Sequence, residues 1–311
     1  MVSEALIEEF GRSIALKGFS LFTVTTYKAN TEKFLKWMLE SKGINRPEDV
    51  RREDLSDFQN FLYTRTRIRD GGPLSLATKA KHILAVKSFF RFLARSGVLP
   101  YNPASDLEIP RINQDRLRPV LDERQVVRFL ESIRGSDAIG IRDRAMFELL
   151  YSTGLRNSEL RELSVDDVDF KSEEVVVRHA KGYYGERQRI VPAGALALAW
   201  TKEYIAKARP KLLQESDTVR TLFITRWGGP VSISALSLIC RQYAKRSGLD
   251  KRISPHILRH SFAVHLLKRG ADIRFVQEML GHASLDSTKL YTKLEISDLK
   301  KIHRRYHPRE R

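Results

Sequence analysis

The residues best suited to chemistry lie at the start of a predicted helix, in the string SPHILRHSFAVHLLKRGADI that begins at Ser254. Ser254 is a favoured N-cap, and Pro255 suits the first helical position. His256 and Arg259 are three residues apart and therefore share a helix face. That face lies at a helix N-terminus, where backbone amides and the helix dipole attract anions. A phosphate bound there would meet a proton-transfer group and a bidentate cation together.

This string alone does not predict an enzyme, because a surface arginine and a capping histidine also fit an ordinary amphipathic helix. A metal site is a second alternative, since His260 and His265 follow on the same helix. A zincin-like helix, however, needs a glutamate directly after its first histidine, and Ile257 stands there. We therefore predict that His260 and His265 are structural.

Three further strings accompany the first: STGLRNSELREL from Ser152, HAKGYYGERQRIVP from His179, and MLGHASLDSTKLYTK from Met279. In this order and spacing, the four strings resemble those of the tyrosine recombinase family, which includes phage integrases and the Xer-type chromosome-dimer resolvases. The resemblance covers the catalytic half, from about residue 120 to 295. The helical N-terminal half is similar to the family's SAM-like core-binding domain.

The resemblance implies a set of catalytic residues. Arg156 and Arg259 match the two arginines that clamp the scissile phosphate and stabilise charge on its non-bridging oxygens. His256 matches the proton-transfer histidine, and His282 matches a second histidine that donates a hydrogen bond to the same phosphate. Tyr291 matches the nucleophile. Clustered arginines are needed beside it because an unperturbed phenol has a pKa near 10.

Two more residues match supporting roles in the family. Glu159, three residues after Arg156, matches the acidic residue that supports the first string, and a surface ion pair is the alternative. Lys181 matches the general-acid lysine at a hairpin turn, and it is the only lysine between Lys171 and Lys202. A solvated surface lysine is the alternative. The turn runs Lys-Gly-Tyr-Tyr-Gly-Glu where many relatives have a second lysine, so the chain departs from the family pattern there.

The mechanism implied by the resemblance is attack of Tyr291 on a phosphodiester, which leaves a 3′-phosphotyrosyl link and a free 5′-hydroxyl. Lys181 would protonate the departing 5′-oxygen, with His256 or a water held by Arg187 or Arg189 as the alternatives. The link conserves bond energy, so no cofactor and no metal ion is expected, and the sequence contains no Walker-type loop and no metal-ligand cluster.

The implied partners are double-stranded DNA with a specific recombination site and a homo-tetramer assembled on two such sites, with an accessory protein left open. Strand relaxation of the type IB topoisomerase kind and a catalytically silent DNA-binding regulator are alternatives on the same scaffold. A basic RNA-binding helical protein is a third alternative, which leaves the four strings unexplained.

Charge and cysteine content agree with action on DNA inside the cell. Lys and Arg number 55 against 38 Asp and Glu, which gives a net charge of +17 and favours a polyanionic partner. The single cysteine, Cys240, excludes an internal disulfide and lies among apolar residues, so we predict it in the core. No apolar run reaches the roughly 18 residues of a membrane span. We expect the protein to be cytoplasmic and associated with the nucleoid, and to bind no membrane.

The elements that hold these residues begin with four helical stretches between residue 3 and about residue 97. Ser20 and Gly43 should bound the second helix, and Ser75 should cap the fourth. Four prolines and no sustained period mark the segment after them as a linker. The predicted domains are a helical core-binding domain at 1–107, a linker at 108–119 and a catalytic domain with a C-terminal tail at 120–311.

The catalytic half should be mostly helical with a small sheet. Asp122 and Gln125 suggest a capping box. The apolar run at 174–178 should pair with 187–192 as a hairpin, and a shorter strand is predicted at 222–225. The predicted fold class is therefore mainly α with a small β-hairpin or sheet in the catalytic domain, after an N-terminal helical bundle. The tail carries apolar residues at helical spacing and should dock either on a neighbouring subunit, as in Xer-type relatives, or on its own.

Overall fold

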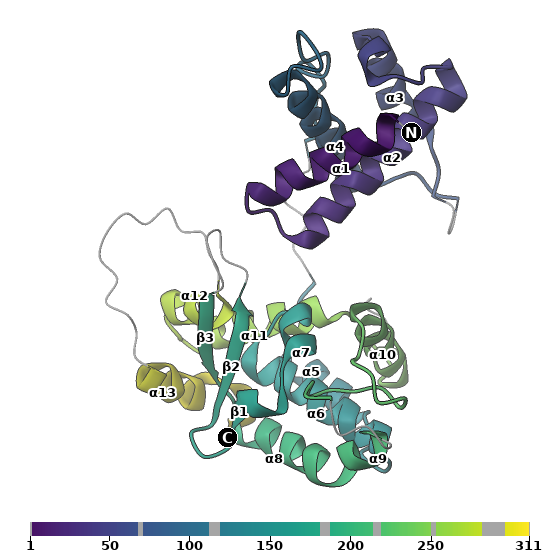
Figure 1. The fold of residues 1–311 in the computed structure, drawn as a ribbon. Coiled ribbons are helices and arrows are strands. Elements are labelled where there is room, and N and C mark those ends of the chain that lie inside the picture. Colours follow the sequence, from purple (N-terminus) through teal and green to yellow (C-terminus); the bar gives the residue numbers. More distant parts are fainter. Residues whose placement is uncertain are drawn as a thin grey trace. The chain divides into compact units, whose positions relative to one another are not determined.

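The computed structural model describes residues 2–67, 71–111, 119–180, 187–213, 219–249, 253–281 and 296–310. The chain divides into two compact units, Met1–Leu117 and Arg118–Arg311 (Figure 1). Each unit has a hydrophobic core of its own. The predicted fold class, mainly helical with a small sheet in the second unit, is confirmed.

Five helical elements form the N-terminal unit: α1 Val2–Leu16, α2 Leu21–Lys42, the short η1 Pro47–Asp49, α3 Arg52–Thr64 and α4 Leu76–Arg95. The predicted caps are confirmed, because the side chains of Ser20 and Ser75 each accept a backbone N–H at the start of α2 and α4. Gly43 ends α2 in the left-handed conformation, with φ 67°.

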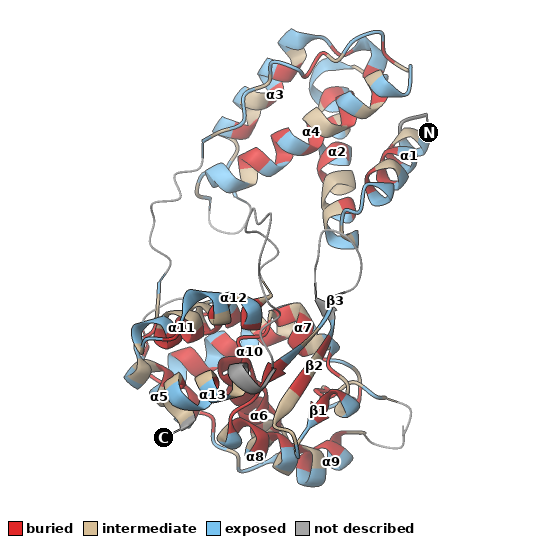
Figure 2. Cartoon of the chain, turned by 90° about the vertical axis from the view of Figure 1, so that its left-hand side faces the viewer, coloured by how far each residue is buried: buried red, intermediate tan, exposed pale blue. Residues whose placement is uncertain are grey.

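Aromatic side chains hold this bundle together. Phe34 of α2 meets Phe58 of α3 and Phe90 of α4 edge to face, with ring centroids 4.9 and 5.8 Å apart. Phe10 of α1 meets Phe89 of α4 in the same way at 5.4 Å. Edge-to-face pairs of buried rings add to the stabilisation that burial itself provides. Figure 2 shows buried residues on each of the helices α1 to α4.

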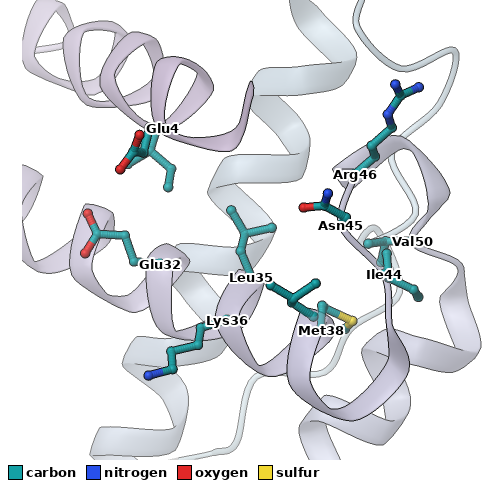
Figure 3. Close-up of a pocket in the computed structure, with 11 residues that line it drawn as sticks. Glu4, Glu32, Leu35, Lys36, Met38, Ile44, Asn45, Arg46 and Val50 are labelled. Carbon is teal, nitrogen blue, oxygen red and sulfur yellow. The ribbon is translucent and has the colours of Figure 1, made fainter. Parts of the chain in front are cut away.

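A pocket of this unit lies between α1, α2 and the segment around η1 (Figure 3). Its charges are mixed: Glu4, Glu32 and Lys36 lie on one side and Arg46 lies across the pocket from them. It contains none of the residues that the sequence predicts to carry chemistry.

The second unit is built around α6. Its helices are α5 Glu123–Glu131, α6 Ala138–Thr153, α7 Asn157–Glu162, α8 Ala195–Glu203, α9 Arg209–Leu213, α10 Ile233–Arg246, α11 Pro255–Lys268, α12 Ile273–Leu280 and α13 Ile296–Tyr306, with shorter turns η2 Val165–Asp167, η3 Tyr204–Ala208 and η4 Pro308–Glu310. All residues from Arg142 to Thr153 of α6 are buried, as expected of a central helix covered on every side. The predicted capping box of Asp122 and Gln125 starts α5. In the part of the chain that the structure describes, no helix is long and apolar enough to span a bilayer.

One antiparallel sheet of three strands, β1 Val168–Asp169, β2 Glu174–Ala180 and β3 Arg187–Pro192, lies in this unit in the order β1-β2-β3. The predicted hairpin is confirmed, with Val175 opposite Val191 and Val177 opposite Arg189. The prediction of a strand at 222–225 is wrong, since this segment makes only isolated bridges. Its polar backbone groups bond elsewhere: the Ile224 amide donates to the Tyr204 hydroxyl, and its carbonyl accepts from Arg142.

The C-terminal helix α13 packs on its own unit, beside β3, α11 and α12 (Figure 1). Its His303 donates from Nε2 to the Ser152 carbonyl at 2.7 Å, and His307, just after the helix, donates to the Tyr151 carbonyl at 3.3 Å. In this single chain α13 therefore packs on its own unit, and docking on a neighbouring subunit stays a prediction.

Candidate active site

Glu159 is the centre of a buried cluster of three arginines. It stands at the third position of α7, where its carboxylate accepts the Arg156 amide at 2.7 Å and closes a capping box. It also accepts Nη1 of Arg156 at 2.6 Å, and Nη1 and Nη2 of Arg189 at 2.9 and 2.8 Å. Nη1 of Arg259 lies 3.9 Å from the same carboxylate. The alternative of a surface ion pair is therefore wrong, because only 2% of the Glu159 side chain is exposed.

The positive and negative charges of this cluster do not balance. Burial alone would raise the pKa of the Glu159 carboxyl, but the hydrogen bonds and charges of Arg189 and Arg156 lower it to about 2. Burial, followed by repulsion from Arg156, lowers the pKa of Arg259 to about 10, which still leaves this guanidinium protonated at neutral pH. Among the described residues, three cations thus surround one anion, which leaves an excess of positive charge for an anionic ligand.

The three guanidinium groups also converge on the C-terminal end of α12. The carbonyls of residues 279 to 281 accept Nε of Arg189 at 3.2 Å, Nη2 of Arg259 at 2.8 Å and Nη2 of Arg156 at 2.7 Å, in that order. The last carbonyls of a helix have no partner within the helix and carry the negative end of its dipole. This helix end therefore helps to hold three like charges close together.

Two glycines in the left-handed conformation shape the site. Gly154, with φ 63°, ends α6, and its carbonyl accepts Nη1 of Arg259 at 2.5 Å. A Cβ there would lie 2.4 Å from the Phe262 ring. Gly281, with φ 62°, ends α12, and a Cβ there would lie 3.1 Å from the Arg189 guanidinium. A larger residue at either position would push a ring or an arginine out of place.

His256 and Arg259 differ in depth although they lie one turn apart on α11. His256 is exposed, whereas Arg259 is buried. Pro255 occupies the first position of the helix as predicted. Ser254 stands at the N-cap as predicted, and its backbone carbonyl accepts the Ile257 amide at 2.9 Å, whereas its side chain makes no capping bond.

Comparisons with known proteins identify the family. Residues 119–297 match the phage integrase family, and residues 7–97 match the N-terminal SAM-like domain of phage integrases. The chain is 36% identical to tyrosine recombinase XerC 2 of Ralstonia nicotianae, over 99% of this chain and 87% of that protein. It is also 36% identical to tyrosine recombinase XerD of Oceanobacillus iheyensis, over 98% and 99%. The chain belongs to the phage integrase family.

It is a tyrosine recombinase, an enzyme that breaks and rejoins DNA strands at specific sites. Two solved structures share its fold. One is the XerH recombinase in a post-cleavage complex with its difH substrate, at a TM-score of 0.66 and 22% identity, over 93% of this chain and 77% of that one. The other is a lambda integrase dimer on a core site, at 0.65 and 20%, over 94% and 98%. The relatives support neither of the alternatives, topoisomerase-like relaxation or a silent regulator.

Three of the recombinase residues predicted from the sequence, Lys181, His282 and Tyr291, lie outside the described residues. The described chain ends beside two of them. Residue 281, whose carbonyl is held by Arg156, directly precedes His282, and Ala180 at the end of β2 directly precedes Lys181. The structure thus brings together Arg156, Glu159 and Arg259, and the roles of all seven predicted residues stay predictions.

Two predictions of structural residues are confirmed in the recombinase. His265 is buried, donates from Nε2 to the Leu121 carbonyl at 2.8 Å and lies with Nδ1 2.8 Å from the Tyr151 hydroxyl. Because a carbonyl only accepts, Nδ1 of the neutral ring accepts the tyrosine proton. Cys240 is fully buried, and burial raises the pKa of its thiol to about 12.

Arg189 is the residue of this cluster that sequence reasoning missed, since it was considered only as a possible holder of a water. Strand alternation contains a signal: on β3, Val191 is buried and Ile190 is exposed, so Arg189 faces inward with Val191. An arginine on the buried face of a strand needs an anionic or carbonyl partner. The sequence does not show which partner it finds.

Proposed function

We propose that Tyr291 of this recombinase attacks a DNA phosphodiester while Arg156 and Arg259 bind the non-bridging oxygens of that phosphate. The observation that supports this role is the excess of guanidinium charge around Glu159. The attack forms a bond from the tyrosine oxygen to phosphorus, breaks the bond to the 5′-oxygen, and yields a 3′-phosphotyrosyl link and a 5′-hydroxyl. Attack by the 5′-hydroxyl of a partner strand reverses the step and releases the tyrosine.

The arginines are suited to stabilise charge that builds up during this step. A guanidinium has five N–H donors in one plane. In bonds between described residues, Arg156 and Arg259 each use two nitrogen atoms on Glu159 or backbone carbonyls. Their remaining donors are held in fixed directions by these bonds. Fixed donors aimed at developing charge need little reorganisation during the reaction.

The other roles belong to residues at the edge of the cluster. His256, exposed at the N-terminus of α11, would exchange a proton with a ligand from solvent. His282 follows the clamped end of α12 and would donate a hydrogen bond to the phosphate. Lys181 would protonate the departing 5′-oxygen. The mechanism uses no metal ion and no cofactor, because two arginines supply the charge.

The proposed substrate is double-stranded DNA with a specific recombination site, bound by a homo-tetramer on two such sites. Two structural relatives support a multimer on DNA: a lambda integrase tetramer bound to a Holliday junction, and XerH bound to difH. The biological task would be chromosome dimer resolution or integration and excision. An accessory protein is a further candidate partner. The net charge of +17 fits binding of DNA phosphates in the cytoplasm, at the nucleoid.

The nucleophile is tested by trapping the covalent intermediate on nicked duplexes that carry candidate sites of the host. The nick lets the cleaved fragment diffuse away, so the adduct accumulates. We expect Tyr291→Phe to form no adduct while its DNA affinity stays within about twofold, because phosphate contacts dominate binding. Tyr306→Phe is the matched control and should form adduct like the wild type. Adduct formed by Tyr291→Phe but not by Tyr306→Phe would transfer the role to Tyr306.

A further inference from the structure

We propose that Arg189 is a positioning residue of the cleavage centre. Through Glu159 it sets the orientation of Arg156, and through the Met279 carbonyl it holds the end of α12 from which the chain leads to His282 and Tyr291. The inference deepens the proposed function and rests on it.

The contacts of Arg189 link three elements that are far apart in the sequence. Its side chain leaves β3 on the buried face, and 10% of it is exposed. Nη1 and Nη2 bind both oxygens of Glu159 on α7, at 2.9 and 2.8 Å, while Nε binds the Met279 carbonyl on α12 at 3.2 Å. A single planar group thus fixes the distance between the helix that carries Glu159 and the end of α12.

These contacts distinguish Arg189 from the two arginines assigned to the phosphate. All three of its nitrogen atoms bind Glu159 or Met279, and its side chain is less exposed than that of Arg156, at 10% against 24%. Its effect on a bound phosphate is therefore transmitted through Glu159, which Arg156 shares, and through the end of α12. A misplacement of about 1 Å at a reacting group can cost about a hundredfold in rate.

Geometry rather than charge is the feature that a lysine cannot replace. The guanidinium fork binds two carboxylate oxygens and a carbonyl at once, whereas an ammonium is a point charge on a flexible stem. Arg189→Lys preserves the charge of the cluster but loses the bidentate bond. This substitution therefore separates positioning from simple electrostatic help.

Arg178 provides the matched control on the neighbouring strand β2. Its Nε binds Asp167, whose side chain is 3% exposed, so it too pairs with a buried carboxylate. Between described residues, however, this pair makes no bond with Glu159 or with the end of α12. Arg178→Lys therefore changes an arginine–carboxylate pair of the same sheet without removing a bond to Glu159, at a side chain that is 55% exposed against 10% for Arg189.

The experiment compares Arg189→Lys and Arg178→Lys with the wild type, with Tyr291→Phe as the blank. We measure adduct formation on nicked duplexes at saturating protein, DNA affinity, and amide hydrogen exchange without DNA. Arg189→Lys should slow adduct formation about 10- to 100-fold, with affinity within about threefold. It should also speed exchange in the last turn of α12. Arg178→Lys should leave the rate and this exchange within about threefold of wild type.

A second substrate carries sulfur in place of the bridging 5′-oxygen, and sulfur leaves without a proton. It should not restore the rate of Arg189→Lys, because positioning and not proton supply is impaired. Rescue by sulfur, a wild-type rate in Arg189→Lys, or an equal loss in Arg178→Lys would each overturn the proposal. So would unchanged exchange in α12. A wild type that forms no adduct would refute the proposed function instead, and the exchange measurement would still decide the role of Arg189.

Discussion

Two buried glutamates of the catalytic unit, Glu159 and Glu148, both bind arginines, yet the two clusters differ in what their arginines hold. Glu148 on α6 is 1% exposed and accepts Nε of Arg144 at 2.9 Å. It also pairs with Arg309, two residues after His307 at the C-terminal end of the chain. Arg144 bonds the Leu130 carbonyl at the end of α5 and lies over the Trp200 ring at 5.2 Å. This cluster joins α5, α6, α8 and the tail.

The arginines of Glu159, in contrast, converge on one helix end and leave part of Arg156 accessible. The side chain of Arg156 is 24% exposed, against 10% for Arg144. Both glutamates pair with an arginine one helical turn away, so spacing along the sequence does not distinguish them. The difference lies in the distant partners, the C-terminal end of α12 in one case and the C-terminal tail in the other.

The largest expected effect tests whether the arginines around Glu159 act on the non-bridging oxygens and leave proton supply to another group. If these arginines act on the non-bridging oxygens, another group must supply the proton for the leaving oxygen, and the proposed group is Lys181. General-acid help is typically worth about 100- to 10,000-fold, so Lys181→Ala should slow cleavage by a factor in that range. A bridging 5′-sulfur leaves as a thiolate, whose conjugate acid has a pKa near 8.5, and should restore most of the lost rate.

Arg156→Ala is the control for this substrate, because its missing charge acts on the non-bridging oxygens whether oxygen or sulfur leaves. Sulfur should do little for it. Equal rescue of both variants, or none for Lys181→Ala, would mean that the proton has another source, with His256 next in order.

The second effect contrasts the two clusters directly through Arg156→Lys and Arg144→Lys. Loss of one fixed donor to a developing anion costs about 100- to 1,000-fold, so Arg156→Lys should slow adduct formation by that factor. Arg144→Lys should keep the rate within about threefold but lower the free energy of unfolding by about 1 to 3 kcal/mol, because buried acceptors on Glu148 and Leu130 lose donors. Adduct assays and denaturant unfolding give both quantities. A rate loss of similar size in the two variants would erase the distinction between the clusters.

Local signals predicted much of the fold correctly. Caps at Ser20, Ser75 and Asp122 act within three residues, and the 174–192 hairpin follows from its apolar β-branched run and its short connection. The strand predicted at 222–225 failed because a local pattern does not reveal that the Ile224 backbone bonds Tyr204 and Arg142. Competition from tertiary contacts decided this segment.

The same limit applies to the candidate site. The positions of Arg156, Glu159 and Arg259 followed from the resemblance, and the structure brings them together. The contacts of Arg189 could not be predicted from the sequence, because its partners are 30 residues away on α7 and 90 residues away on α12. Spacing predicts contacts within a turn or across a hairpin, and this contact depends on how three elements pack.

The smallest effect separates the two clusters by pH. The tail bound to Glu148 is also held by His303 and His307, which are stacked 4.6 Å apart and buried. Burial is the main cause that lowers the pKa of both, to about 4 for His303 and well below the usual 6.5 for His307, where His303 and Arg309 add repulsion. His307 also accepts the Arg309 amide on Nδ1 at 3.3 Å, so a proton there would face another donor.

Because the folded pKa of His303 is below the unfolded value of 6.5, its unfolded form binds the proton more readily. Stability is therefore complete above pH 6.5 and falls as pH decreases toward 4, by about 1.4 kcal/mol per pH unit for each such histidine. The Glu159 cluster, whose carboxyl has a pKa of about 2, loses stability only below the unfolded value of 4.5. Denaturant unfolding at pH 7, 6 and 5 should show the loss, and His303→Gln, which retains a donor for the Ser152 carbonyl, should show a shallower dependence. If the unfolding free energy of His303→Gln depended on pH as steeply as that of the wild type, a neutral His303 would not be what holds α13. The two clusters would then differ in their positions and not in their pH dependence.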